Sequence, residues 1–282
     1  MIKVLNPGIY TTVQDQGRFG YRDKGVPVSG FMDTISGQLA NSLVGNPIRA
    51  AVLEMTMTGP EMIFDEDGVF AITGALMSPK LNGEDISNNR AYEVKKGDVL
   101  KFGRLVIGFR SYLAIAGGFT TEKVLNSRSW YFPITSLTHL PKGYELPVGE
   151  KYKECDTDSI HHENEIDFDD NRLKVFTGPE YDLISKDQQE QLLNGIFSVA
   201  KENNRMAYQL NESIFPHNLS ILTSATRPGT VQLTPAGKLI ILMKDAQTTG
   251  GYPRIFQLSD EAICLLAQKK TGDEICFERI SI

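Results

Sequence analysis

Short apolar runs separated by turn residues cover most of the chain, a pattern that is typical of strands. Residues 1–7 are expected to form a strand and a turn, and Asn82-Gly83 and Gly97-Asp98 are typical of turns between antiparallel strands. Further strands are predicted at residues 52–64, 69–76, 92–102, 105–115, 173–176, 219–223, 231–233, 239–243 and 275–282. The pattern therefore predicts a mainly β protein.

Three segments show helical periodicity, and each is expected to pack on a sheet. The first covers residues 33–43. The second follows Ser185, whose spacing from Gln188 fits a capping box, and the third follows Ser259, with acidic residues in its first turn. The apolar positions that fit one face of the second helix are Leu192, Leu193, Ile196 and Val199.

The length of 282 residues is comfortable for two domains. We expect an N-terminal β unit over residues 1–150, an acidic linker or excursion over 151–170, and a C-terminal β unit over 171–282, with interleaving of the two units as an alternative. His161 and His162 are neighbours in the acidic segment. Adjacent side chains of an extended chain point in opposite directions, so we expect no metal site there.

Charge and cysteine content narrow the class of protein. The formal net charge of −6 argues against nucleic acid as a partner. No apolar run approaches the roughly 20 residues that span a bilayer, and the N-terminus lacks the apolar core of a signal peptide. Three cysteines without metal-ligand spacing predict reduced thiols rather than a disulfide framework. We expect a cytoplasmic protein that binds a small molecule.

Residues 244–255 form the densest polar segment, and they directly follow the predicted strand 239–243. Paired glycines allow close approach of the backbone, and Pro253 fixes the exit from the turn. Polar groups at the end of a strand need protein partners or a ligand, so the segment is either a binding site or a tight corner of a barrel. The substrate-binding candidates here are Gln247, Thr248, Thr249, Gly250, Gly251 and Tyr252.

Asp245 is the candidate general base, or the carboxylate that orients a substrate amine. Gln232 precedes it on what is expected to be a neighbouring strand, which would place an amide beside the carboxylate.

Two further clusters suit anions. Asp15 can orient Arg18, and the arginine then either presents its planar fork to a carboxylate or phosphate or staples the N-terminal loop. Ser127-Arg128-Ser129 places a cation between hydroxyls soon after Gly117-Gly118. Glu54, within an apolar strand, must be paired or functional, because burial of an unpaired carboxylate is costly.

The chain has no Ser-His-Asp pattern, phosphate-binding loop, dinucleotide fingerprint or metal-binding spacing. It therefore looks like one part of a larger assembly.

In their order along the chain, these motifs resemble the biotin-dependent carboxyltransferase/allophanate hydrolase subunit 2 family, and within it the KipA-like proteins that form the C subunit of 5-oxoprolinase. The resemblance covers nearly the whole chain. It is carried by TTVQDQGRFGY (11–21), GVPVSGFMD (25–33), NSLVGN (41–46), LEMTMTGPE (53–61), YLAIAGGF (112–119), SRS (127–129), NRMAY (204–208), PGTVQ (228–232) and DAQTTGGYPRI (245–255).

The resemblance implies two cyclophilin-like β-barrel units with a few short helices. It also implies two partner proteins, one KipI-like (the B subunit) and one LamB/YcsF-like (the A subunit), with which such proteins open 5-oxoproline to L-glutamate at the expense of ATP. Two alternatives stay open. One is a regulator that binds a KipI-like inhibitor of a histidine kinase. The other is a carboxyltransferase subunit of a biotin-dependent urea or allophanate system, in which biotin would be the cofactor.

Under the oxoprolinase hypothesis, Arg18, Arg128 and Arg205 would stabilise phosphate or carboxylate. Asp245, Gln232 and Thr249 would position the lactam amide, and Tyr252 would form a wall of the pocket.

The chain departs from the family pattern at several positions. Asn126 stands where the family usually has Gly, and Ala207 replaces the Gly of Arg-Met-Gly-Tyr. The segment 224–227 replaces Ser-Glu-Gly, and Thr234-Pro235 replaces Pro-Pro.

Overall fold

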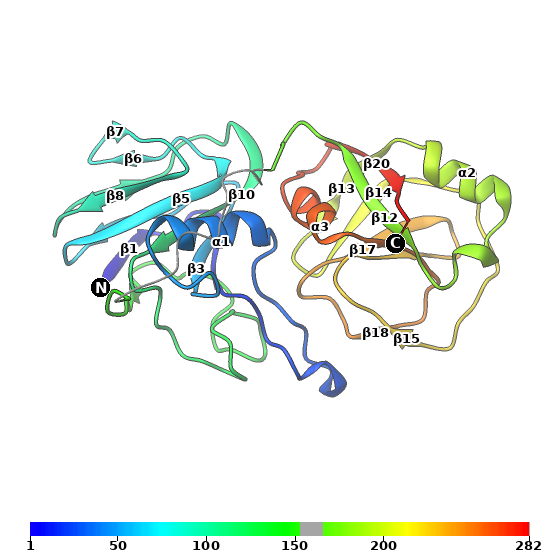
Figure 1. Cartoon of the computed structure of the whole chain (residues 1–282), viewed down its shortest axis with the longest axis horizontal. Helices are drawn as coiled ribbons and strands as arrows, with labels where there is room; N and C mark the ends of the chain where they lie inside the picture. Colours follow the sequence, from blue (N-terminus) through cyan, green and yellow to red (C-terminus); the bar gives the residue numbers. More distant parts are fainter. Residues whose placement is uncertain (153–165, 282) are drawn as a thin grey trace. The chain divides into compact units, whose positions relative to one another are not determined.

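The computed structural model describes residues 1–152 and 166–281, which divide into two compact units (Figure 1). Unit 1 consists of Met1–Arg18 and Ser29–Ile166, and unit 2 consists of Phe19–Val28 and Asp167–Ile282. The chain therefore leaves unit 1 once, early in the sequence, to contribute a short segment to unit 2. Residues 153–165 of the predicted linker, with Cys155, His161 and His162, lie outside the described residues.

Unit 1 contains two antiparallel sheets that share one apolar core. Val4 and Phe64 of the first sheet and Leu53 and Leu113 of the second are among the buried residues of this core. In hydrogen-bonded order, the first sheet is β11 (Glu145–Leu146), β1 (Ile2–Asn6), β4 (Glu61–Phe64), β9 (Val99–Lys101), β6 (Lys80–Leu81) and β7 (Glu84–Asp85). The second is β2 (Tyr10–Gln14), β3 (Val52–Thr56), β10 (Ile107–Ile115), β5 (Gly68–Leu76) and β8 (Arg90–Val94).

Helix α1 (Thr34–Leu43) packs on the five-stranded sheet (Figure 1). Along β3, Leu53 belongs to the core between the sheets, whereas Val52 packs with Phe31 and Ala40 in a second cluster beside the helix. Because both faces of this strand are covered, its sequence is a continuous apolar run rather than an alternating one. Only Glu54 interrupts that run.

Glu54 is paired, as its burial requires. Its Oε2 accepts hydrogen bonds from the Met32 amide at 2.8 Å and the Tyr112 hydroxyl at 3.0 Å, and its Oε1 lies 3.9 Å from Arg110 Nε. Burial, followed by the Glu54 charge, raises the pKa of Tyr112 well above its ordinary value, so the phenol stays a donor. The expectation that Glu54 is either paired or functional is confirmed, because the side chain is paired within the fold.

Unit 2 is a closed barrel of seven strands. In order they are β12 (Arg172–Thr177), β19 (Arg254–Leu258), β16 (Thr230–Leu233), β17 (Lys238–Leu242), β14 (Ala207–Ser213), β13 (Phe197–Asn203) and β20 (Glu274–Arg279). Parallel pairing of β20 with β12 closes the ring. A separate two-stranded ribbon joins β15 (Ser224–Ala225) to β18 (Thr249–Gly250). Two single turns, η1 (Arg22–Lys24) and η3 (Tyr181–Leu183), complete the unit with its two helices.

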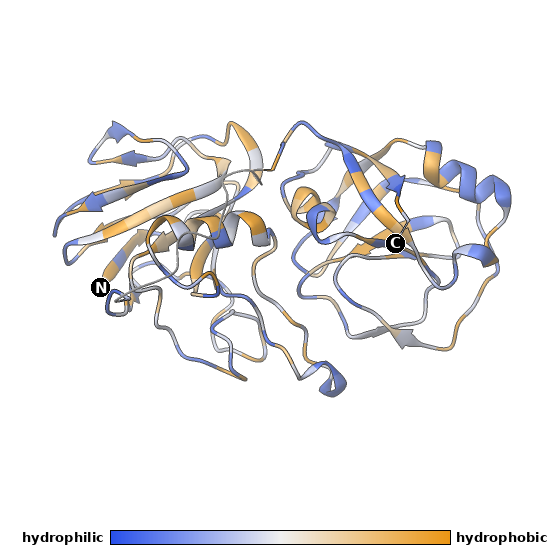
Figure 2. Ribbon diagram, in the orientation of Figure 1, coloured by the Kyte–Doolittle hydropathy of each residue, from blue (hydrophilic) through white to orange (hydrophobic). Residues whose placement is uncertain are grey.

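Helix α3 (Asp260–Ala267) packs against β12 and β19, and α2 (Lys186–Asn194) packs against β20. Figure 2 shows α3 as mainly hydrophobic and α2 as mainly hydrophilic, in agreement with burial of residues 262–267 on α3. None of the helices in the described part of the chain is long and apolar enough to cross a bilayer.

The mainly β fold and the three helices are confirmed. Asp33, Ser185 and Ser259 cap the helices through their side chains, and Ser185 forms the predicted box with Gln188. The extension of the second helix to Val199 is wrong. The backbone becomes extended at Gly195, and Val199 instead belongs to β13, a strand that the periodicity concealed.

Three predicted strands also need correction. Met57, with a positive φ of 63°, breaks residues 52–64 into β3 and β4, and a turn at 95–98 separates β8 from β9. Residues 219–223 form no strand, and Leu222 is 98% exposed there. The apolar residues of this loop gave the sequence pattern of a strand, but the segment pairs with no strand in the described part of the chain.

Candidate functional site

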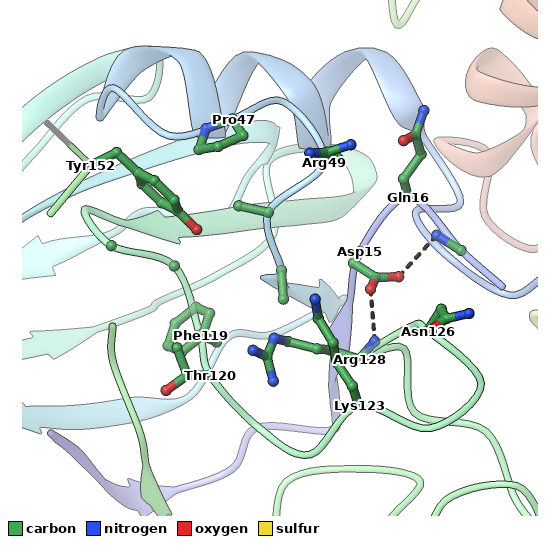
Figure 3. Close-up of a pocket in the computed structure, with 15 residues that line it drawn as sticks. Asp15, Gln16, Pro47, Arg49, Phe119, Thr120, Lys123, Asn126, Arg128 and Tyr152 are labelled. Atoms are coloured by element: carbon green, nitrogen blue, oxygen red, sulfur yellow. Dashed lines mark hydrogen bonds between the residues drawn. The ribbon is translucent and has the colours of Figure 1, made fainter. Parts of the chain in front are cut away.

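Unit 1 contains a cavity of about 490 Å³ beside the end of β10 (Figure 3). Its wall includes Gly117 and Gly118, which follow β10, and Asp15 and Gln16, which follow β2. The loop that carries Arg128 forms another side. This volume lies in the range of small-molecule sites, about 300–1,000 Å³.

Asp15 fixes the backbone of the loop that carries Arg128. Its carboxylate accepts hydrogen bonds from Gly17 N at 2.9 Å, Ser127 Oγ at 2.6 Å, Arg128 N at 2.7 Å and Ser129 Oγ at 2.7 Å. Charge-assisted bonds of this kind are roughly twice as strong as neutral ones. The aspartate therefore positions Arg128 through the Arg128 amide, and its oxygens already accept from four donors.

The same loop contains two residues in the left-handed backbone region, Leu125 at φ 52° and Asn126 at φ 64°. Glycine adopts this conformation freely, and asparagine is among the few other residues that tolerate it. The departure from the family pattern at position 126 is therefore compatible with the same turn. Leu125 has no such tolerance, so the loop stores strain next to Arg128.

Arg18 lies behind this loop and is completely buried. It donates to the carbonyl oxygens of Ser129 at 2.5 Å and Val124 at 3.2 Å, and to Ser29 Oγ at 3.3 Å. These contacts favour the second of the two interpretations of the sequence, in which Arg18 staples the N-terminal loop. Asp15, which was expected to orient Arg18, accepts a hydrogen bond from the Arg128 amide.

Three cationic side chains line the cavity: Arg49, Lys123 and Arg128. None of the three has a hydrogen-bond or ion-pair partner for its side chain in residues 1–152 and 166–281. Arg128 is half-buried, whereas Arg49 and Lys123 are exposed. In Figure 3, Arg128 and Lys123 lie on the opposite side of the cavity from Arg49, and the Tyr152 hydroxyl points inward.

Sequence reasoning identified Arg128 but missed Arg49, Lys123 and Tyr152. These residues are far apart in the chain and have no motif of their own. The nearest signal was the family motif 41–46. Its Asn46 side chain accepts from Gly117 N at 2.9 Å and donates to Ile115 O at 2.8 Å, which fixes the segment before Arg49 to the end of β10.

In unit 2, Arg205 and Asp245 form a buried two-point ion pair. Arg205 Nε donates to Asp245 Oδ2 at 2.8 Å and Nη2 to Oδ1 at 3.3 Å, and the side chains are 6% and 9% exposed. Both oxygens of the carboxylate are directed at the guanidinium in such a pair. Asp245 is therefore better suited to orient a neighbouring group than to abstract a proton.

Gln232 is 1% exposed, and its Nε2 has no hydrogen-bond partner within the described chain. β16 and β17 are neighbours as expected, but Gln232 pairs with Ile240 of β17, so its amide makes no bond to Asp245. The Nε2 instead lies against Gly250, where an added Cβ would come within 2.5 Å of it. A buried donor without a partner is costly unless a ligand or water uses it.

Residues 247–252 are held to unit 2 by Thr226. Its hydroxyl donates to Gln247 O at 2.6 Å, and its amide donates to Thr248 O at 3.0 Å. The Thr226 carbonyl in turn accepts from Arg22, which belongs to the Phe19–Val28 segment. Burial lowers the pKa of Arg22. The family departures at 224–227 thus lie in β15 and the residues that follow it, which support the predicted site.

The remaining predicted residues of this segment face outward. Gln247, Thr249, Gly251 and Tyr252 are exposed, whereas Thr248 and Gly250 are half-buried. A second cavity of about 720 Å³ in unit 2 is lined by Thr226, Thr230 and Arg254, among others, but not by Asp245 or Gln232. Arg254 is itself paired with Glu180 at 2.8 Å.

The predicted site residues thus form two groups. Asp15, Arg18 and Arg128 are close together in unit 1. In unit 2, Arg205 contacts Asp245, and Gln232 lies against Gly250 in the same segment as Thr249 and Tyr252. Within the part of the chain that the structure describes, no cluster of three or more His, Cys, Asp or Glu side chains is arranged to hold a metal ion.

Comparison with known proteins gives a consistent relationship. The C subunit of 5-oxoprolinase from Escherichia coli is 34% identical over 288 residues, which is 100% of this chain and 92% of that protein. The Haemophilus influenzae protein of the same name is 32% identical over 100% of this chain and 92% of its own length. Urea amidolyase of Lachancea kluyveri is 45% identical over 130 residues, or 46% of this chain and 7% of that protein.

The Kluyveromyces lactis urea carboxylase structure superposes with a TM-score of 0.87 at 29% identity. The match covers 99% of this chain but spans only 27% of the carboxylase. The family model for the carboxyltransferase domain, subdomain A and B, matches residues 24–279. The chain therefore belongs to the carboxyltransferase domain family, subdomains A and B.

Proposed function

We propose that this chain is the C subunit of an ATP-dependent 5-oxoprolinase complex that opens 5-oxo-L-proline to L-glutamate. The observation that carries the proposal is the similarity to the C subunit of Escherichia coli 5-oxoprolinase, which extends over 100% of this chain and 92% of the relative. The partners in this proposal are a KipI-like protein, the B subunit, together with a LamB/YcsF-like protein, the A subunit. The chain is then a hydrolase component that needs both partners for turnover.

Each unit supplies side chains that suit a part of this chemistry. An unstrained lactam resists direct hydrolysis, and phosphoryl transfer from ATP to its carbonyl oxygen activates the ring carbon for attack by water. Arg128 then stabilises the negative charge of the phosphoryl or carboxylate group, as a preorganised cation does. Gln232 and Thr249 hold the lactam amide, Asp245 is held in place by Arg205, and Tyr252 closes one wall.

A second candidate is carboxyl transfer within a biotin-dependent system. The observation that favours it is the superposition on Kluyveromyces lactis urea carboxylase, with a TM-score of 0.87 over 99% of this chain. In that role the chain supplies only one part of the machinery, because it spans 27% of the carboxylase.

Glutamate release from 5-oxoproline tests the proposal. The chain is mixed with its cognate KipI-like and LamB/YcsF-like partners and ATP, and each protein and ATP are omitted in turn. We expect glutamate only when all four are present. An assembled complex that releases none overturns the proposal and favours carboxyl transfer or a regulator that binds the KipI-like partner.

Arg128→Ala provides the residue-level test. Because the guanidinium has no partner for its side chain in residues 1–152 and 166–281, the variant is expected to fold normally. Loss of one preorganised charge-stabilising group typically reduces kcat by about 10²–10³. Unchanged turnover in an intact complex would remove Arg128 from the reaction.

A further inference from the structure

The cavity of unit 1 has an unusual charge for this molecule. The chain carries a formal net charge of −6. Yet the cavity is lined by three cations, Arg49, Lys123 and Arg128, and by one carboxylate, Asp15. One carboxylate against three cations leaves an excess of positive charge, and the Asp15 oxygens already accept hydrogen bonds from four donors of its own loops. A concave surface with an excess of one charge concentrates ligands of the opposite charge.

We infer that this cavity is a binding site for a small oxyanion, a carboxylate or phosphoryl group, held by Arg128 with Arg49 and Lys123. Arg128 is the anchor, because its backbone is fixed by Asp15 while its guanidinium is free of any partner in the described residues. An arginine fork matches both carboxylate and phosphate oxygens. The inference deepens the proposed function, and rests on it for the choice of ligands, since 5-oxoproline carries a carboxylate and ATP carries phosphates.

The backbone amides around the cavity do not supply the binding. Gly117 N donates to Asn46 Oδ1, and the amides of Gly118, Phe119 and Thr120 donate to carbonyl oxygens. The glycines therefore do not act as a nest of free N–H groups of the kind that binds phosphate in other folds. Recognition therefore rests on the side chains that line the cavity, chiefly the three cations. Binding of this type weakens as salt screens the charges.

The two glycines have a steric role instead. Gly117 has φ 95°, and an added Cβ would lie 2.2 Å from the carbonyl oxygen of Gly149. Gly118 has φ 69°, and its Cβ would meet Ala50 at 3.4 Å and the Tyr152 hydroxyl at 3.9 Å. The glycine pair thus allows the chain to turn tightly at the end of β10, beside the cationic side chains.

Binding to the full chain alone tests the inference. The probes are pyrophosphate, 5-oxoproline and L-glutamate, with 2-pyrrolidinone as the neutral lactam that lacks an oxyanion, and calorimetry at low salt measures Kd. We expect at least one oxyanion to bind, 2-pyrrolidinone not to bind, and added salt to weaken the affinity. Preference for pyrophosphate assigns the cavity to a phosphoryl group, and preference for the amino acids assigns it to a carboxylate. Failure of every oxyanion to bind overturns the inference.

The variants locate the site. Arg128→Ala is expected to weaken Kd by about tenfold or more, the usual scale for a charge-assisted bond, with smaller losses for Arg49→Ala and Lys123→Ala. Arg104→Ala is the matched control, because Arg104 is an exposed arginine of unit 1 that does not line the cavity. Equal affinity in the three cavity variants and the control would overturn the assignment. Arg49 and Lys123 are exposed, so their variants stay informative if Arg128→Ala misfolds.

These outcomes are separate from those of the glutamate assay. If the chain binds an oxyanion through Arg128 but the complex releases no glutamate, the binding site is supported and the proposed reaction is overturned. If the complex releases glutamate but the chain alone binds no oxyanion, the proposed reaction is supported and the binding site is overturned.

Discussion

The cavity arginines of unit 1 and the paired arginines of unit 2 differ in what holds their side chains. In unit 1, Arg128 lines a cavity with Arg49 and Lys123, and none of the three has a partner for its side chain in the described residues. In unit 2, Arg205 and Arg254 are each held by a carboxylate through two nitrogen atoms. Among the described residues of unit 2, the buried side-chain atom without a hydrogen-bond partner is instead Nε2 of a neutral amide, Gln232.

This difference distinguishes two kinds of arginine: those that stabilise the fold and those whose side chains are available to bind a ligand. A guanidinium already bound to a buried carboxylate gains little from an incoming anion, and its loss leaves a buried charge unpaired. A guanidinium without a partner costs the fold little when it is removed and remains available to a ligand. We propose that Arg128 is an arginine of the second kind. Stability and turnover measured on the same variants test that division.

Arg205→Ala is expected to have the largest effect on stability. It leaves the Asp245 carboxylate buried without its partner, which typically costs about 3–5 kcal/mol. Urea unfolding of the isolated chain measures the change. Arg227→Ala, an exposed arginine of the same unit, is the control and is expected to stay within about 0.5 kcal/mol of wild type.

The double variant Arg205→Met with Asp245→Leu sharpens this comparison. Replacing both charges with apolar groups removes the unpaired carboxylate, so most of the lost stability should return. If Asp245 also orients the substrate, turnover of the assembled complex stays low although the fold is restored. A loss below about 1 kcal/mol for Arg205→Ala would mean that the pair contributes little to unit 2.

Asp15→Ala is the corresponding variant in unit 1. It leaves donors on Ser127, Ser129, Gly17 and Arg128 without their acceptor in a largely buried loop, for an expected cost of about 2–4 kcal/mol. Asp85→Ala removes an exposed aspartate of the same unit and should change stability by less than about 0.5 kcal/mol. A stable Asp15→Ala chain would show that the loop is held by other contacts.

Gln232→Met is expected to increase stability while it reduces turnover. The amide is buried at a cost because it has no partner, and a methionine of similar size avoids that penalty, for a gain of about 1 kcal/mol. If the amide holds the lactam, activity of the complex falls at least about tenfold. Gln209→Met, on the exposed face of β14, is the matched control. A destabilised Gln232→Met chain would mean that the amide finds a partner in solution.

The strands and helix caps could be predicted from the sequence because they depend on neighbouring residues. Ser185 and Gln188 are three residues apart, and they form the capping box that their spacing indicates. β13 was missed because Ile196 and Val199 continue a helical spacing, although Gly195 ends the helix. Where helical periodicity continues past a residue that ends a helix, pairing with distant strands decides which structure forms.

The site could be predicted only where one motif contains it. Arg128 lies between two serines and was recognised, whereas Arg49 and Lys123 reach the same cavity from segments with no motif. Contacts at long sequence separation also decided the roles. Arg18 is close to Asp15 in the chain, but it donates to Ser129 and Val124, more than a hundred residues away. Pattern alone does not reveal which acceptor a guanidinium finds.

The pair of Arg254 and Glu180 gives the smallest expected effect, and it depends on pH. The hydrogen bond from Arg254 is the main cause that lowers the pKa of Glu180 below its ordinary value of 4.5. Because the folded pKa is the lower one, the stabilisation is fully present above about pH 4.5 and is lost as the pH falls through the folded pKa. Glu180→Gln should therefore destabilise the chain by about 1 kcal/mol near neutral pH and by less near pH 3. Urea unfolding at both pH values measures this, with Glu190→Gln on the exposed side of α2 as the control. A difference between Glu180→Gln and wild type that does not shrink in acid would show that Arg254 holds a neutral acceptor equally well, and the contrast between paired and unpaired arginines would then not extend to Arg254.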